Sequence, residues 1–363
     1  MQNKKHLQRK IYDKEILDVI SWLRFPLIMG VVLAHCNLYA LVENWEGAAP
    51  QWSGWLVYIF KYLYWIILPA RVPLLFIISG YLFFRTEGRR DKSFFTDKYK
   101  RRIHSLLIPY IFWNTIAIAI QYIRFEIIGG ENYSLAEYMC GYWSSIFNGN
   151  PADSPLWFMR DLMVVSLFSP LLYILIKGRY GFVVIAAFAV AYILNLRIPI
   201  ESFGTEAFLF FTTGAYIAVH RYDITSIPHN IGIGTLLLYI PLQLYSNEYE
   251  SYSIYTQSVN LVTTAIKITA AFYAVSLLFK KNVLSPTPRL TKICFLLYAL
   301  HGIIIGPIIK TLYYNIPCNN NPFVLLAIYI VTPLIILAFT LFLFDKMKRY
   351  TPLLATILTG NRK

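Results

Sequence analysis

Long apolar stretches separated by short polar loops make up most of this chain. The apolar runs are continuous, and most approach the roughly 20 residues that a helix needs to cross a bilayer. A membrane β-barrel would instead alternate apolar and polar positions over segments of about ten residues. The predicted helices cover 16–41, a stretch ending at 84, 105–125, 156–176, 180–196, 203–219, 229–246, 257–279, 291–313 and 322–344. This pattern predicts an all-α integral membrane protein, a bundle of about ten transmembrane helices.

The composition agrees with a membrane protein. Of the 363 residues, 57% are hydrophobic and 14% are charged, and the mean hydropathy is +0.51. A soluble domain averages about 25% charged residues. The four cysteines are Cys36, Cys140, Cys294 and Cys318. They lack the spacing of a metal site, so we expect no metal and interpret them as small apolar fillers.

The positive charge of the chain is concentrated in a few segments. A net charge of +14 would suit a nucleic-acid partner, but such a partner needs a basic patch or stripe. The basic segments are 1–15, 85–102, 177–179, 280–292 and 346–363. They fall on one side of the bilayer if ten helices alternate, and the positive-inside rule makes that side the cytoplasm. We therefore expect no nucleic-acid partner, and both termini in the cytoplasm.

The same charge pattern divides the chain into three parts. Residues 1–15 are expected to form a basic cytoplasmic N-tail, 16–345 a single transmembrane domain, and 346–363 a cytoplasmic C-tail.

An arginine and a histidine interrupt the first apolar run. An arginine at the centre of a membrane helix costs roughly 2.5 kcal/mol or more, which favours a functional role. About three helical turns and a rise of about 16 Å separate Arg24 from His35. The two side chains therefore share one face of the helix, with Arg24 nearer the cytoplasm and His35 nearer the outer surface. The structural alternative is a snorkelling arginine and a histidine packed between helices.

Other polar residues lie within the predicted helices. Arg160 and Asp161 are adjacent, and a local ion pair would lower their cost of burial. His301 fits either a cavity or a buried position with a hydrogen bond to a neighbouring helix. Lys61 and Lys310 fit snorkelling near helix ends, whereas Lys267 lies deeper and has no assigned role.

Two further positions have a structural interpretation beside a functional one. Ser79, next to Gly80, is interpreted as a close-packing or kink site rather than a nucleophile, because small residues are typical of membrane helix interfaces. Trp157 begins a predicted helix and fits an interfacial anchor equally well.

Five sequence blocks, in order, resemble acyltransferase family 3, the polytopic bacterial O-acyltransferases of envelope sugars. The blocks are Arg24-FPLIMGVVLA-His35, RVPLLFIISGYLFF from Arg71, KYKRRIHSLLIPYIFWN from Lys98, PLWFMRDL from Pro155, and FLLYALH ending at His301. Each block alone is weak, but together they span most of the chain. One departure is Ser21, where the family often has an acidic residue; Asp18, one turn earlier, is a possible substitute.

The resemblance implies an acyl-CoA dependent O-acyltransferase of the bacterial inner membrane. His35 would be the catalytic base, because the ordinary pKa of histidine is nearest to working pH. Arg24 and Arg71 would hold the nucleotide and pantetheine arm of acyl-CoA, with the basic loop 85–102. Arg160, Trp157, His301 and Ser79 are candidates to contact substrate or line the cavity. We expect no tightly bound cofactor; the donor would be acyl-CoA, with acetyl as the expected acyl group.

Several alternatives stay open at this point. The chain could instead be a transporter or flippase for an anionic sugar or lipid, with its intramembrane arginines along the path. The basic loop fits anionic lipid as well as CoA. His35 could act as a base in direct transfer or become acylated itself. The acceptor is expected to be a saccharide or lipid-linked sugar, selected chiefly by the outer segment 126–155.

Overall fold

The computed structural model describes residues 2–38, 41–43, 54–58, 70–86, 90–128, 136–137, 139–140, 151–196, 204–247, 253–317 and 321–360. Over these residues the chain is helical, without a β-strand. The first half contains α1 (Gln2–His35), α3 (Gly54–Tyr58), α5 (Arg71–Phe84), α6 (Lys92–Arg102), the π-helix η2 (Ile103–Leu107) and α7 (Ile108–Ile128). A 3₁₀ turn, η3 (Ser154–Leu156), then leads into α9 (Trp157–Leu167), α10 (Ser169–Ile176) and α11 (Gly181–Ile193). The second half contains α12 (Thr205–His220), α13 (His229–Asn247), α14 (Ile254–Lys280), α15 (Pro288–Asn315), α16 (Pro322–Tyr350) and α17 (Pro352–Leu358).

A helix lies over each of the ten predicted segments. Within the described residues, five helices are long and apolar enough to cross a membrane, and six if one bent pair counts as a single span. The chain is therefore a multi-pass helical membrane protein. A count of ten spans and the cytoplasmic position of the termini stay predictions. Lys61 and most of the outer segment 126–155 lie outside the described residues.

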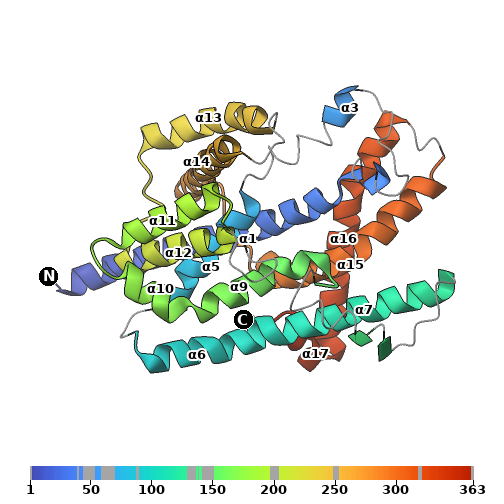
Figure 1. Ribbon diagram of the computed structural model, residues 1–363, viewed down its shortest axis with the longest axis horizontal. Helices are drawn as coiled ribbons and strands as arrows, with labels where there is room; N and C mark the ends of the chain where they lie inside the picture. Colours follow the sequence, from blue (N-terminus) through green and yellow to red (C-terminus); the bar gives the residue numbers. More distant parts are fainter. Residues whose placement is uncertain are drawn as a thin grey trace.

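Two helices differ from their predicted form. The basic segment 2–15 continues α1 without a break (Figure 1), because it contains neither proline nor glycine and is rich in good helix formers. The predicted helix 156–176 bends by 60° between α9 and α10. Pro170 explains the bend, because its ring clashes with the carbonyl four residues earlier, that of Ser166, and because proline has no N–H to bond that carbonyl.

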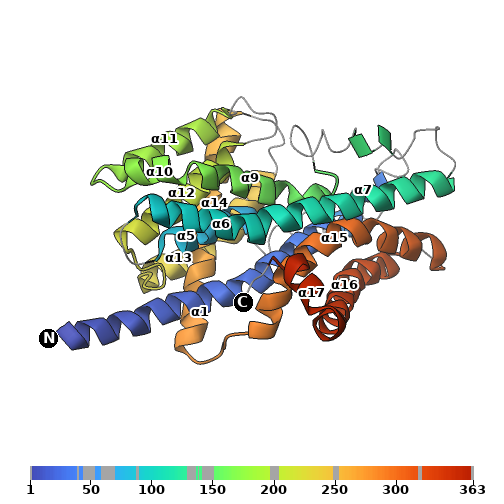
Figure 2. The ribbon, with the colours of Figure 1, turned by 90° about the horizontal axis from the view of Figure 1, so that it is seen from below.

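Helix α1 crosses the middle of the bundle and packs against α5, α14, α15 and α16 (Figure 2). The most extensive helix pair is α5 with α12. Their backbones meet at two glycines, where an added Cβ would stand 2.0 Å from a carbonyl oxygen of the other helix, Phe211 for Gly80 and Ile77 for Gly214. Small residues allow such close approach in membrane bundles.

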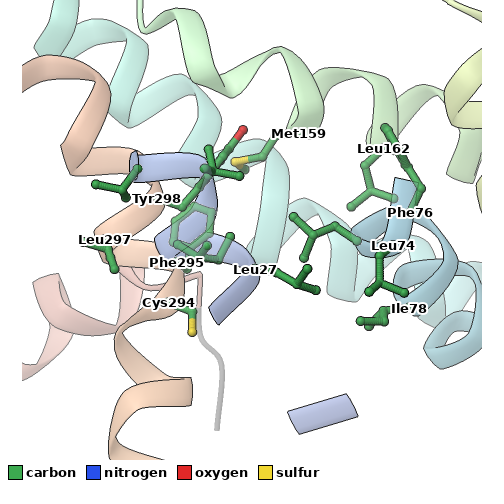
Figure 3. Close-up of a cluster of buried hydrophobic side chains, with 14 of the residues drawn as sticks. Leu27, Leu74, Phe76, Ile78, Met159, Leu162, Cys294, Phe295, Leu297 and Tyr298 are labelled. Atoms are coloured by element: carbon green, nitrogen blue, oxygen red, sulfur yellow. The ribbon is translucent and has the colours of Figure 1, made fainter. Parts of the chain in front are cut away.

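A buried apolar cluster joins four helices around the centre. Figure 3 shows Leu27 of α1, Phe76 of α5, Met159 of α9 and Phe295 of α15 within it. This cluster fixes the relative positions of the four helices that supply most of the candidate site residues.

One long rod, α6–η2–α7, runs along the edge of the bundle (Figure 1). The Ile108 N–H bonds to the Ile103 carbonyl, which is the π-type register. Pro109 has no N–H to offer the Ser105 carbonyl, so the ordinary ladder is interrupted here. The end of the chain packs on this place: Trp113 Nε1 donates to the Leu358 carbonyl at 3.4 Å, and Gly360 lies against the Ser105 backbone.

Candidate functional site

A cavity of about 420 Å³ lies between α1, α5, α9 and α15. Its walls are largely apolar, and they include Arg24 of α1 and Ser79 of α5. Phe158 and Tyr298 also line it, and α6 supplies Lys98, Arg101 and Arg102 as further lining residues. The cavity is thus mainly apolar, and these three α6 residues form its basic rim.

The basic rim has no acidic counterpart among the described residues that line the cavity. Lys98 Nζ lies 5.5 Å from the Phe83 ring centroid and 5.3 Å from that of Phe94, and the Arg102 guanidinium carbon lies 5.1 Å from that of Phe83. Cations over aromatic faces are held without being neutralised. Three basic side chains of α6 therefore line the cavity, with no acidic side chain among its described lining residues.

The position of the rim depends on the start of α6. Asp91 is its N-cap and accepts a hydrogen bond from the Phe94 N–H at 3.1 Å and from the Ser93 hydroxyl at 2.7 Å. These bonds, that from Ser93 first, lower the pKa of the Asp91 carboxyl below its ordinary value. The sequence predicted a basic loop at 85–102, but not the helix that directs three of its cations into one cavity.

Two histidines meet next to Tyr298, which lines the cavity. His35 is the last residue of α1 and is exposed, whereas His301 of α15 is fully buried. Their ring centroids are 5.2 Å apart, at an interplanar angle of 54°. His301 Nδ1 lies 2.5 Å from the Tyr298 carbonyl oxygen. Because a carbonyl only accepts, Nδ1 carries the hydrogen, and Nε2 of the neutral ring has a free lone pair.

Tyr298 connects the cavity to the histidine pair. Its side chain lines the cavity, and its ring centroid is 5.8 Å from that of His301. Its hydroxyl donates to the Pro155 carbonyl. His35 itself does not line the cavity. Arg24 and His35 nevertheless both lie on the side of α1 that faces α15, Arg24 beside Cys294 and His35 against His301.

The other predicted site residues occupy separate places. Arg71 begins α5, and its Nη1 donates to the Gly30 carbonyl at 3.0 Å, so it holds α1 between Arg24 and His35. Arg160 is buried and paired with Asp161, with Nη2 to Oδ1 at 3.1 Å. Neither arginine lines the cavity.

Three positions complete the set. Trp157 begins α9, next to the cavity-lining Phe158, but does not itself line the cavity. Ser79 does line it, one residue before the close-packed Gly80. Lys267 of α14 is buried, and it makes no hydrogen bond to another described residue.

Comparison with known proteins places the chain in a family. The sequence profile of acyltransferase family 3, described as an acyltransferase domain, matches residues 17–343. The chain therefore belongs to this family, and it is a membrane acyltransferase. Among its relatives is the succinoglycan biosynthesis protein ExoH of Rhizobium meliloti (strain 1021), 25% identical over 367 residues that cover 96% of this chain and 94% of ExoH. No solved structure matches the chain.

Proposed function

We propose that this acyltransferase moves an acyl group, acetyl in the first instance, from acyl-CoA to a hydroxyl of an envelope saccharide or its lipid-linked precursor. The observation that supports it most is the cavity with the basic rim, whose lining residue Tyr298 contacts the histidine pair. The residues that line the cavity match the parts of acyl-CoA one by one. Phosphates suit Lys98, Arg101, Arg102 and Arg24, and a pantetheine arm suits the apolar walls. No tightly bound cofactor is required.

In the proposed reaction the acceptor hydroxyl oxygen attacks the thioester carbonyl carbon. A new C–O bond forms while the hydroxyl proton passes to the His35 imidazole. The C–S bond then breaks, and the leaving CoA thiolate takes up the proton, giving the ester and free CoA. His301, with Nε2 free, packs against His35 and orients it. Arg71 holds the α1 backbone between donor and base.

The acceptor and the membrane follow from the family and from the charge pattern. The name of ExoH connects that relative to succinoglycan biosynthesis, which supports an exopolysaccharide or its lipid-linked precursor as acceptor. The basic segments support an inner-membrane protein with its donor rim toward the cytoplasm. The acceptor would then arrive from the side of His35.

A transporter or flippase is less well supported. That hypothesis needs unneutralised arginines along a path for an anion. Arg160 is paired with Asp161, and neither Arg160 nor Arg71 lines the cavity. Arg24 is the one of the three that lines the cavity.

The test uses the purified full chain in nanodiscs with ¹⁴C-acetyl-CoA and exopolysaccharide de-esterified by mild alkali. We expect label transfer to the polysaccharide, with thioester loss that depends on the acceptor. His35→Ala should abolish transfer, and His104→Ala, an exposed position on η2, should not. Saccharide movement across vesicles without thioester loss would favour the transporter. A labelled protein intermediate would replace direct transfer by an acyl-enzyme.

Donor binding can be measured separately through Cys294, which lines the cavity beside Arg24. A variant that retains Cys294 and has the other three cysteines changed to serine reports alkylation of this thiol. Acetyl-CoA should slow the alkylation, and charge reversal of Arg24 should remove that protection. Equal rates with and without acetyl-CoA would contradict the proposed donor site.

A further inference from the structure

The short segment before α9 is fixed by three side chains from other helices. Gln121 of α7 donates to the Ala152 carbonyl at 3.1 Å, and Asn114 Oδ1 accepts from the Asp153 N–H at 3.2 Å. Tyr298 of α15 donates to the Pro155 carbonyl. Asn114 is itself fully buried and donates to the Tyr110 carbonyl at 2.8 Å. The backbone around Asp153 is therefore held in one position.

The side chain of Asp153 has no such partners. It is 2% exposed, and neither carboxyl oxygen makes a hydrogen bond to any described residue. Buried polar atoms in folded proteins almost always have a partner, and an exception needs an explanation. The backbone around Asp153 is satisfied, so the unpaired carboxyl is not the result of a loose loop.

The carboxyl lies against α15 next to the histidine pair. An added Cβ at Gly302 would stand 2.2 Å from Asp153 Oδ1 and 2.7 Å from Pro155 Cδ, so only glycine leaves room for it. Gly302 follows His301, whose Nε2 is also buried without a hydrogen-bond partner in the described part of the chain. Two polar groups without a hydrogen-bond partner among the described residues thus lie at neighbouring positions of α15: the Nε2 atom of His301, and the Asp153 carboxyl against Gly302.

Asp153 lies next to exposed residues. Ser154, next to Asp153, is exposed, and His35 is exposed where its ring contacts that of His301. The donor cavity adjoins the same histidine through Tyr298, and Asp153 is not among the residues that line it. A ligand of the Asp153 carboxyl would therefore lie outside the donor cavity.

We infer that Asp153 binds the acceptor, by accepting a hydrogen bond from a saccharide hydroxyl adjacent to the one that is acylated. This inference rests on the proposed function. A carboxyl group keeps an acceptor oxygen in either protonation state, so a sugar hydroxyl satisfies it. Asp153 thereby determines which hydroxyl faces His35.

The test compares Asp153→Ala and Asp153→Asn with the wild type in nanodiscs, using ¹⁴C-acetyl-CoA and the de-esterified exopolysaccharide. Asp153→Ala should raise the KM for the polysaccharide at least tenfold and leave the acetyl-CoA protection of Cys294 unchanged. Asp153→Asn keeps an acceptor oxygen and should recover part of the affinity. Asp345→Ala, an exposed position on α16, is the matched control and should have the wild-type KM.

A second variant guards against simple misfolding. Gly302→Ala places a methyl group against the carboxyl without removing it, and should raise the same KM. An unchanged polysaccharide KM in Asp153→Ala would overturn the inference. So would an equal loss of donor protection and of acceptor affinity, since that indicates a structural role. If the wild type itself transfers no label, the proposed function fails instead, and the two failures are distinguishable.

Discussion

The rings of His35 and His301 lie 5.2 Å apart between centroids, although one ends α1 and the other lies inside α15. The exposed ring faces the side from which the acceptor is proposed to arrive, and the buried ring has its Nδ1 hydrogen committed to the Tyr298 carbonyl. One imidazole is therefore accessible, and the other is held in a single tautomer behind it.

The histidine pair should act as a unit. Replacing either His35 or His301 with alanine is expected to lower kcat for acyl transfer by about 10²–10⁴, the usual contribution of a positioned acid–base group. The double variant should be little worse than the worse single variant, because residues in one catalytic unit are not additive. The measurement is kcat at saturating donor, with Cys294 protection as the check on folding. If the fold-losses in kcat of the two single variants multiply in the double variant, His35 and His301 have independent roles.

The basic rim should control donor affinity. Reversing the charges of Arg101 and Arg102 to glutamate is expected to raise the KM for acetyl-CoA at least about tenfold, since each unit charge pair near a surface contributes on the order of 1 kcal/mol or more. The effect should shrink at high salt. Lys346→Glu combined with Lys348→Glu, both exposed on α16, is the control with the same total charge change. If the rise in KM depends on the anionic lipid content of the nanodisc and not on the acetyl-CoA itself, the rim binds anionic lipid instead.

The close approach of α5 and α12 should tolerate no added methyl group. Gly80→Ala would place its Cβ 2.0 Å from the Phe211 carbonyl oxygen, and overpacking of this kind typically costs about 1–3 kcal/mol. We expect a lower Tm in detergent and lower activity, because Ser79 beside it lines the cavity. Gly234→Ala in α13 meets nothing within 4 Å and should leave Tm unchanged or slightly higher. Equal Tm values for Gly80→Ala and the wild type would contradict the predicted clash.

The helices were largely predictable because each is a continuous apolar run with a polar boundary. The pairing of Arg24 and His35 on one side of α1 was also predictable, because helical periodicity alone places them there. The position of Arg71 was not, since its partner, the Gly30 carbonyl, lies on another helix. Arg160 forms an ion pair with Asp161, its neighbour in the sequence, which is the pair that the sequence suggests.

Two site features escaped sequence reasoning for different reasons. The rim of α6 had a readable signal, because Asp91 before the run from Lys92 to Arg102 is a typical N-cap. Asp153 had none beyond its place in the outer segment 126–155, because its burial depends on Gly302 of a helix distant in the sequence. The bend at Pro170 lies between these cases, because a proline within an apolar run indicates a kink but does not determine its angle of 60°.

The last prediction concerns pH and the start of α6. The pKa of the folded-state Asp91 carboxyl is lowered by its hydrogen bonds from Ser93 and Phe94, so its unfolded value is the higher of the two, about 3.9. Its contribution to α6 is therefore fully present above that value and is lost as pH falls through the folded-state pKa. A nitroxide label on a Thr96→Cys variant, exposed on α6, should become more mobile over that range. Asp91→Ala should be mobile already at pH 7 and should show no such transition. Matching pH profiles for the two proteins would mean that Asp91 does not hold the helix that carries the donor rim.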